Sequence, residues 1–83
     1  MRPMKYVYLL QSLAQSDQRY VGLTNDLRQR LASHNQGRSP HTSKYAPWRI
    51  VAAIRFNDDQ RAAAFERYLK TGSGRAFANR NLW

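Results

Sequence analysis

The chain has 83 residues, which is enough for one domain around a single small core and excludes a second folded unit. Fourteen Lys and Arg residues against five Asp and Glu residues give a formal net charge of +9, which favours a polyanionic partner such as nucleic acid and disfavours cationic or hydrophobic partners. The absence of cysteine excludes disulfide frameworks, zinc fingers and zinc ribbons, so any chemistry must use oxygen and nitrogen atoms.

The first predicted elements are two strands of a β-hairpin. Lys5–Ser12 is aromatic, β-branched and apolar, as is typical of a buried strand, and Arg19–Thr24 is its expected partner. If the hairpin centres on Ala14, Tyr8 lies directly opposite Tyr20. The two tyrosines are therefore expected on one face of the sheet.

A helix is predicted after the second strand. Gly22 is expected to close that strand and to let the chain turn closely beneath the tyrosine face. Thr24 or Asn25 is the expected N-cap of a helix from Leu27 to about His34, with Asp26 favourable at the positive end of its dipole. A loop, Gln36–Ala46, is expected to follow.

The second half predicts a third strand and a long helix. Trp48–Phe56 is an almost continuous apolar run, which indicates a strand. Asn57 and Gln60 fit a capping box, which predicts that a helix begins there, and the apolar pattern continues to Thr71.

A short final helix completes the expected architecture. The GSG sequence of residues 72–74 is expected to stop the preceding helix, and Arg75–Leu82 is predicted to be helical, with Phe77 and Trp83 packed on the core. The order strand, strand, helix, strand, helix, helix predicts an α+β fold, a small three-stranded and mainly antiparallel sheet flanked by helices, in a single domain over residues 1–83.

The basic N-terminus precedes an apolar run that is too short for a signal peptide or a membrane span. The run covers residues 6–10, whereas a membrane-spanning helix needs about 20 apolar residues. The sequence therefore predicts a cytoplasmic protein without a membrane partner.

Arg30 and His34 lie beside the apolar stripe of the first predicted helix. With Leu27 as the core direction, Leu31 lies about 40° away, His34 about 20° and Arg30 about 60° on the other side. Residues four apart share one helix surface, so the pair presents a guanidinium and an imidazole together. The alternative is structural, because arginine stems often extend from the edge of a stripe and a lone core histidine is often simply hydrogen bonded.

Glu66 is the only glutamate in the chain. Asp59 precedes it by seven residues, which is about 10 Å along one helix. The two carboxylates are therefore too far apart to hold a pair of metal ions about 4 Å from each other, and at most one metal ion is expected. The alternative for Glu66 is an ordinary surface ion pair with Lys70, four residues later. Tyr8 and Tyr20 likewise have an alternative as ordinary strand residues of the core.

Together these residues resemble the GIY-YIG nuclease superfamily. The segments that carry the likeness are YVYLL at residues 6–10, YVG at residues 20–22, Arg30 and His34 at ten and fourteen residues after Tyr20, and Glu66 in the late run FERYLKTGSGRAFANR. The resemblance covers nearly the whole chain and is greatest to small standalone bacterial members of predicted endonuclease type. The first motif is degenerate, because Tyr6 stands in place of its glycine.

The resemblance implies a metal-dependent phosphodiesterase that acts on DNA. Glu66 would hold one Mg²⁺ or Mn²⁺ ion, and Arg30 would neutralise charge on the phosphorus. Tyr8 or Tyr20 would take a proton from the attacking water, assisted by the other tyrosine or by His34. Because free tyrosine has a pKa near 10, Arg30 or the metal is expected to lower it.

Basic side chains around these positions are the expected contacts to nucleic acid: Arg28, Arg38, His41, Lys44, Lys70 and Arg75. Tyr45 and one of Asn79 and Asn81 are further candidates by the same resemblance. The function expected first is a magnesium-dependent DNA endonuclease, or a structure-specific nuclease that acts on branched or damaged DNA in repair or recombination. A noncatalytic nucleic-acid-binding module with the same fold and a protein-interaction adaptor are the alternatives.

Overall fold

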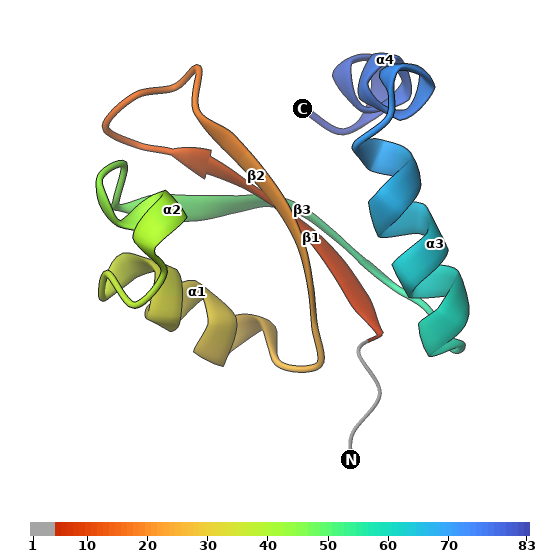
Figure 1. Cartoon of the computed structure of the whole chain (residues 1–83), viewed down its shortest axis with the longest axis horizontal. Coiled ribbons are helices and arrows are strands. Elements are labelled where there is room, and N and C mark those ends of the chain that lie inside the picture. Colours follow the sequence, from red (N-terminus) through yellow and green to blue (C-terminus); the bar gives the residue numbers. More distant parts are fainter. Residues whose placement is uncertain (1–4) are drawn as a thin grey trace.

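The computed structural model describes residues 5–83 as a three-stranded sheet with helices packed on both of its faces (Figure 1). The elements, in chain order, are β1 (Tyr6–Ser12), β2 (Arg19–Thr24), α1 (Leu27–Asn35), α2 (Pro40–Ser43), β3 (Trp48–Arg55), α3 (Asp59–Leu69) and α4 (Gly72–Asn81). The predicted α+β class and element order are confirmed, and the predicted loop contains the short helix α2. Residues 1–4, the start of the predicted domain and of the basic N-terminus, lie outside the described residues.

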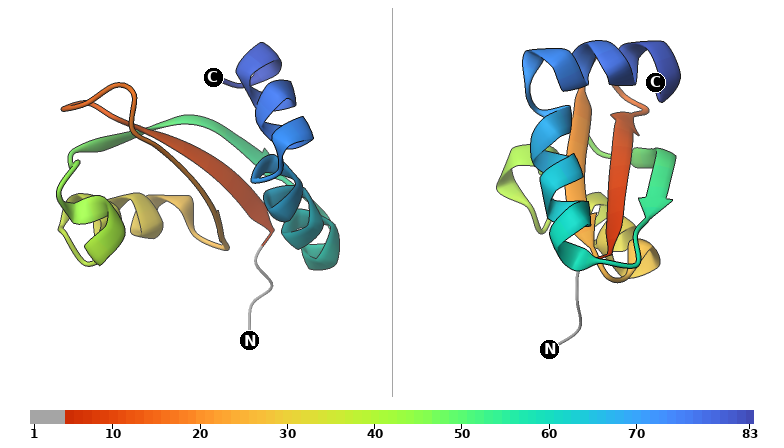
Figure 2. Two further views of the ribbon diagram at one scale, coloured as in Figure 1. Left: turned by 45° about the horizontal axis from the view of Figure 1, so that its top comes forward. Right: turned by 90° about the vertical axis from the view of Figure 1, so that its right-hand side faces the viewer.

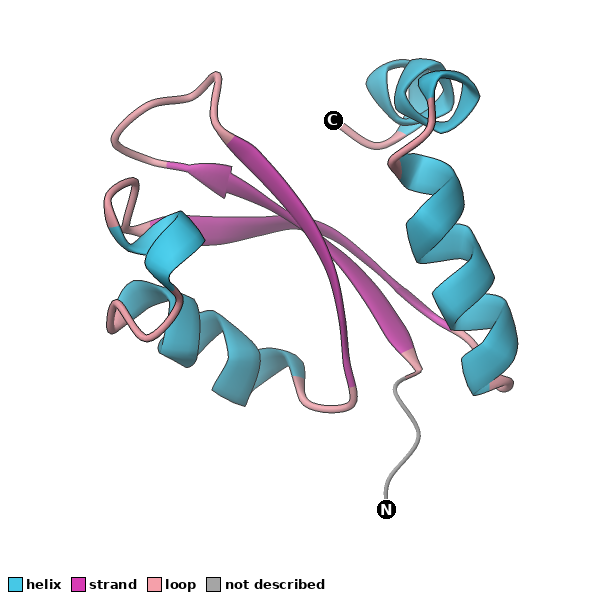
Figure 3. Ribbon diagram, viewed as in Figure 1, coloured by secondary structure: helices cyan, strands magenta, loops and turns pink. Residues whose placement is uncertain are grey.

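The sheet has the strand order β2-β1-β3, and both pairings are antiparallel (Figure 3). The predicted hairpin register is wrong: Tyr8 pairs with Gly22 and not with Tyr20, because the hairpin centres on Gln15 and not on Ala14. Moving the centre by one residue changes the register by two. Since side chains alternate with period two, both tyrosines remain on one face.

The Ser12 side chain holds the turn between β1 and β2. Its Oγ accepts hydrogen bonds from the backbone N–H groups of Ala14 (3.1 Å) and Gln15 (2.9 Å), and it donates to the Tyr45 carbonyl oxygen (2.6 Å). The Ser12 N–H in turn donates to the Gln18 carbonyl oxygen at 3.0 Å. Local side-chain bonds of this kind compete with the strand ladder and end it early.

Two small cores lie on opposite faces of the central strand β1. Figure 2 shows the helices on these faces, α3 and α4 on one side of the sheet and α1 on the other. Val7 and Leu9 pack toward α3 and α4, and Tyr8 and Leu10 pack toward α1. The first core also contains Ala62, Leu69 and Ala78, and the second contains Trp48 with the partly buried Leu27 and Leu31. The alternation of β1 thus decides which helix each of its side chains meets.

Aspartate side chains cap α1 and α3, one residue later than predicted. Asp26, not Thr24 or Asn25, is the N-cap of α1, and its carboxylate accepts the Gln29 N–H. Asp58, not Asn57, is the N-cap of α3. In both cases the carboxylate combines a hydrogen bond with favourable charge at the helix N-terminus.

The GSG sequence begins α4 and does not simply stop α3. Helix α3 ends at Leu69, and the Thr71 hydroxyl caps α4 by accepting the Gly74 N–H at 3.1 Å. A Cβ at Gly74 would overlap the Tyr68 carbonyl group, so glycine lets the two helices join closely. Within the described residues no helix is long and apolar enough to cross a membrane.

Candidate active site

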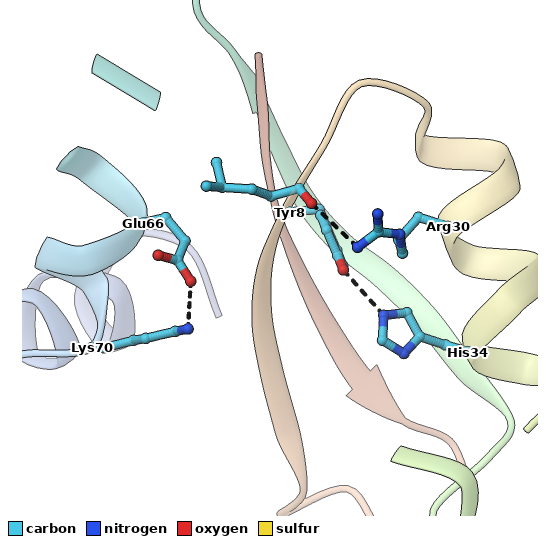
Figure 4. A network of polar contacts seen from close by, with 6 residues as sticks. Tyr8, Arg30, His34, Glu66 and Lys70 are labelled. Atoms are coloured by element: carbon cyan, nitrogen blue, oxygen red, sulfur yellow. Dashed lines mark hydrogen bonds and ion pairs between the residues drawn. The ribbon is translucent and has the colours of Figure 1, made fainter. Parts of the chain in front are cut away.

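Tyr8 lies at the centre of a polar cluster between the sheet and α1. Its side chain is buried, with 1 % exposure, and its Oη lies 3.0 Å from His34 Nε2 (Figure 4). Gly22 is the strand partner of Tyr8, and a Cβ there would lie 2.5 Å from the Tyr8 Oη. Gly22 therefore lies within β2, where it leaves room for the phenol; the expectation that it closes the strand and allows a turn is wrong.

Hydrogen bonds continue from Tyr8 through His34 to α2. His34 is 3 % exposed, and its Nδ1 lies 2.8 Å from Thr42 Oγ1. The Thr42 hydroxyl donates a longer bond, 3.5 Å, to the Ser39 carbonyl oxygen, which can only accept. We therefore assign the proton of neutral His34 to Nδ1, which donates to Thr42, so that Nε2 accepts the Tyr8 O–H.

Burial makes Tyr8 hold its proton. It raises the pKa of Tyr8 to about 12, with a further contribution from Tyr20 and a smaller one from Glu66, and the lowering by Arg30 does not compensate. Arg30 does lower the pKa of Tyr8, as expected, but burial raises that pKa by more. Burial, followed by the Arg30 charge, lowers the pKa of His34, which agrees with a neutral imidazole accepting from the phenol.

Tyr20 is the second phenol of the cluster. Its ring meets the His34 ring edge-on, with centroids 4.9 Å apart, and lies 6.2 Å from the Tyr8 ring. Unlike Tyr8, Tyr20 is only partly buried and lines an open pocket. Tyr20 is therefore the tyrosine of this pair that a bound molecule can reach.

Arg30 and His34 both project from α1 toward the sheet, as their helical spacing predicts (Figure 4). Arg30 is partly buried, and its Nη1 donates to the Leu23 carbonyl oxygen at 3.4 Å. This bond holds the guanidinium beside β2, where it acts on both Tyr8 and His34. Because His34 uses both ring nitrogens within the protein, it acts through Tyr8 and Thr42.

Glu66 approaches from the other side of β2. Helix α3 packs on the opposite face of the sheet, and Figure 4 shows Glu66 across β2 from Tyr8. Its carboxylate forms an ion pair with Lys70, as the structural alternative predicted, but the Glu66 side chain is only 13 % exposed while that of Lys70 is 56 % exposed. Glu66 also contributes to the raised pKa of Tyr8, so its charge reaches the tyrosine cluster.

Comparison with known proteins identifies the family of this chain. The family model described as the GIY-YIG catalytic domain matches residues 4–81. The chain belongs to the GIY-YIG family. It is also similar to the UPF0213 protein of Lactococcus lactis subsp. cremoris (strain SK11), with 33 % identity over 66 residues, which cover 78 % of this chain and 65 % of that relative. No solved structure matches the chain at a significant level.

The family model that matches the chain describes a catalytic domain and covers nearly all of the described residues. The chain itself covers about two thirds of the length of the Lactococcus lactis relative. The predicted site residues Tyr8, Tyr20, Arg30 and Glu66 come from four elements, β1, β2, α1 and α3. The fold brings the first three together and places the fourth across one strand.

The GIY-YIG chain offers few ligands for a metal ion. Within residues 5–83 no group of three or more His, Cys, Asp or Glu side chains is placed to hold one. A single carboxylate nevertheless suits Mg²⁺, which keeps several waters and takes the remaining oxygens from a substrate phosphate. The Glu66 carboxylate therefore suits an ion that binds together with nucleic acid. Without such an ion, Glu66 pairs with Lys70.

The predicted nucleic-acid contacts of the GIY-YIG domain are all exposed and lie in two groups. The first belongs to α1, α2 and the segments after them, and the second lies at the junction of α3 and α4. Arg28, Arg38, His41 and Lys44 form the first group, and Lys70 and Arg75 form the second. The groups thus come from the helices on both sides of the sheet, and their contacts to nucleic acid stay predictions.

Sequence reasoning missed Thr42 and the role of Gly22. Thr42 lies in a segment predicted to be loop, eight residues after His34, and no motif connects the two. Only the short helix α2 turns its hydroxyl toward the imidazole. The signal for Gly22 was present in the YVG segment, but its meaning depended on the hairpin register.

Proposed function

We propose that this chain is a divalent-metal-dependent endonuclease that hydrolyses phosphodiester bonds in DNA. What supports the proposal is family membership together with one observation: two phenols, an imidazole and a guanidinium gather on one sheet face where apolar side chains would pack better. Buried polar groups cost free energy unless they are hydrogen bonded, so their presence favours a functional role.

Tyr20 is the residue proposed to act as the base: its phenolate, formed by loss of its own proton to solvent, accepts the proton of the attacking water. It is the phenol that a bound strand can reach, whereas Tyr8 is buried and holds its proton on the bond to His34. Tyr8 and His34 are positioning residues in this scheme, because their bonds fix the ring against which Tyr20 packs. Neutral His34 also offers an acceptor for the Tyr8 proton.

Arg30 is proposed to bind the phosphate that is cleaved. Its planar guanidinium can donate two parallel hydrogen bonds to phosphate oxygens, and it stays charged at every physiological pH. Because the bond to Leu23 already restrains Arg30, little reorganisation is needed as negative charge develops.

Glu66 is proposed to hold one Mg²⁺ or Mn²⁺ ion. When bound, the ion supplies Lewis-acid stabilisation of charge on the phosphate and leaving oxygens. The Glu66 carboxylate must exchange its bond to Lys70 for this role, and the exposure of Lys70 leaves that side chain free to move toward a phosphate.

A second candidate is a noncatalytic nucleic-acid-binding module. The observation that favours it is the Glu66–Lys70 pair, which occupies the only candidate metal ligand. Such a module would keep the basic surface and bind in a salt-dependent way.

The test compares wild type with Glu66→Gln and Asp59→Asn, which each remove one carboxylate charge from α3. Labelled plain, nicked and branched DNA is incubated with each protein in Mg²⁺ or Mn²⁺, and the initial cleavage rate is measured. We expect Glu66→Gln to lose at least about 100-fold in rate, the scale of removing one group that stabilises transition-state charge. Asp59→Asn should cleave like wild type, because Asp59 is exposed in the first turn of α3.

Two results would contradict the proposal. Equal cleavage by wild type and Glu66→Gln would remove Glu66 from the mechanism and point to a contaminating nuclease. Binding of all substrates without cleavage in either metal would favour the noncatalytic module. Preference for branched or nicked DNA would fit a role in repair or recombination.

A further inference from the structure

A pocket of about 530 Å³ opens beside the tyrosine cluster. It lies between the start of β2, the end of α3 and α4. Its lining residues include three cations, Arg19, Lys70 and Arg75, one acid, Asp17, and the aromatic residues Tyr20 and Trp83. Pockets of roughly 300–1,000 Å³ accommodate small organic groups, so this one is large enough for a single nucleotide.

Arg19 has a fixed orientation at this pocket although it is an exposed residue. Its guanidinium carbon lies 4.7 Å from the centroid of the Trp83 ring, and its Nη1 donates to Asn79 Oδ1 at 2.9 Å. The indole and the amide thus restrain a planar cation that would otherwise be mobile. Within the described residues no carboxylate lies at ion-pairing distance from Arg19.

The pocket borders the proposed active site at two residues. Tyr20 belongs to its lining and also packs against the rings of Tyr8 and His34. Lys70 lines it and also pairs with Glu66. A molecule in the pocket therefore lies next to the ion-pair partner of Glu66.

Cations together with flat side chains suit one chemical class, an unpaired nucleotide. Bases stack on aromatic rings and on arginine planes, and their phosphates bind nearby cations. A base within a duplex cannot do so, because its neighbours already cover both of its faces. The pocket therefore distinguishes unpaired from paired nucleotides by base stacking. Net charge attracts both single and double strands and cannot make this distinction.

We infer that this pocket binds one unpaired nucleotide of the substrate strand, with its base stacked on the Arg19 guanidinium and its phosphates near Lys70 and Arg75. The position of this nucleotide beside the cleaved phosphate rests on the proposed function. The substrate class is therefore strands that carry unpaired nucleotides, of DNA or RNA.

The test measures binding by fluorescence anisotropy in EDTA, so that no cleavage occurs. The probes are labelled 20-nucleotide strands of thymidylate and of uridylate and a 20-base-pair DNA duplex. Wild type is compared with Arg19→Lys, which keeps the charge but loses the plane, and with Arg61→Lys, the matched change at an exposed arginine of α3 that does not line the pocket. Circular dichroism of each variant checks that its fold is retained.

We expect Arg19→Lys to weaken binding of at least one single strand by about 5-fold or more, the smaller end of the cost of losing one stacked base. Its duplex binding should stay that of wild type, and Arg61→Lys should match wild type on all probes. The strand that responds, thymidylate or uridylate, identifies DNA or RNA as the source of the nucleotide.

Three results would overturn the inference: equal single-strand affinities for Arg19→Lys and Arg61→Lys, equal losses on single strand and duplex, or no single-strand binding by wild type. Because this assay needs no metal and no cleavage, its outcome is separate from that of the Glu66→Gln experiment. A protein that never cleaves but loses single-strand binding in Arg19→Lys would sink the nuclease proposal and leave the pocket assignment standing.

Discussion

At the scale of single residues, the Thr42 hydroxyl decides which nitrogen of His34 carries the proton. Because Thr42 accepts from Nδ1 and donates onward to Ser39, Nε2 is left as the acceptor for Tyr8. A buried hydroxyl far from any substrate thus sets the proton positions in the tyrosine cluster.

Replacing Thr42 separates this role from simple packing. Thr42→Val keeps the shape but leaves the buried Nδ1–H without an acceptor, which costs about 1–3 kcal/mol. We expect Thr42→Val to lower the rate of DNA cleavage and to change its pH profile, while Thr42→Ser keeps both. The measurement is the cleavage rate from pH 5.5 to 8.5. Identical profiles for all three proteins would show that Thr42 only fills space.

At the scale of elements, β2 depends on a glycine in its interior. Glycine normally weakens a strand, but here the Tyr8 phenol lies where a side chain at position 22 would be. Both the pairing of β1 with β2 and the burial of Tyr8 therefore require glycine at position 22.

The variant Gly22→Ala tests this requirement. Its Cβ would meet the Tyr8 ring, so we expect the free energy of unfolding to fall by about 1–3 kcal/mol, as for other overpacked cores. Gly72→Ala is the matched control, because a Cβ there meets nothing within 4 Å, and it should leave stability unchanged or slightly higher. Urea unfolding measures both, and an unaffected Gly22→Ala would mean that the phenol moves aside without cost.

At the scale of the whole molecule, a net charge of +9 on one small domain makes every added proton unfavourable. His34 is buried on the α1 side of the sheet beside Arg30, and burial followed by the Arg30 charge lowers its pKa. Protonation of His34 would also turn Nε2 from an acceptor into a donor. Nε2 could then no longer accept the hydrogen bond that the Tyr8 O–H donates. Acid is therefore expected to weaken the folded state through this one side chain.

The expected pH dependence has a definite sign. The pKa of His34 is lowered by folding, so below the unfolded value of about 6.5 the unfolded chain binds more protons and stability falls as pH falls. Urea unfolding at pH 7.5 and 5.5 should show this loss in wild type and in His41→Gln, because His41 is exposed. His34→Gln should show a smaller loss. An equal loss in His34→Gln would assign the acid sensitivity to other groups.

Patterns within short windows predicted the elements well because they depend on local chemistry. The apolar strands, the Leu27–His34 helix and the direction of Arg30 all follow from periodicity. The hairpin register did not, because the Ser12 hydroxyl holds the turn through a bond to Tyr45, thirty-three residues away. The N-caps were misassigned by one residue among neighbouring polar side chains that can all accept hydrogen bonds.

The sequence by itself determined the basic character of this protein, its α+β element order and the residue types of its site, because composition and short spacings are properties of the chain alone. The tertiary structure decided how those residues meet: Tyr8 is buried while Tyr20 is partly exposed, Glu66 lies across β2, Thr42 bonds to His34, and Arg19 packs on Trp83. These facts depend on contacts between distant segments. Only packing establishes which side chains are desolvated and which are left in reach of a substrate.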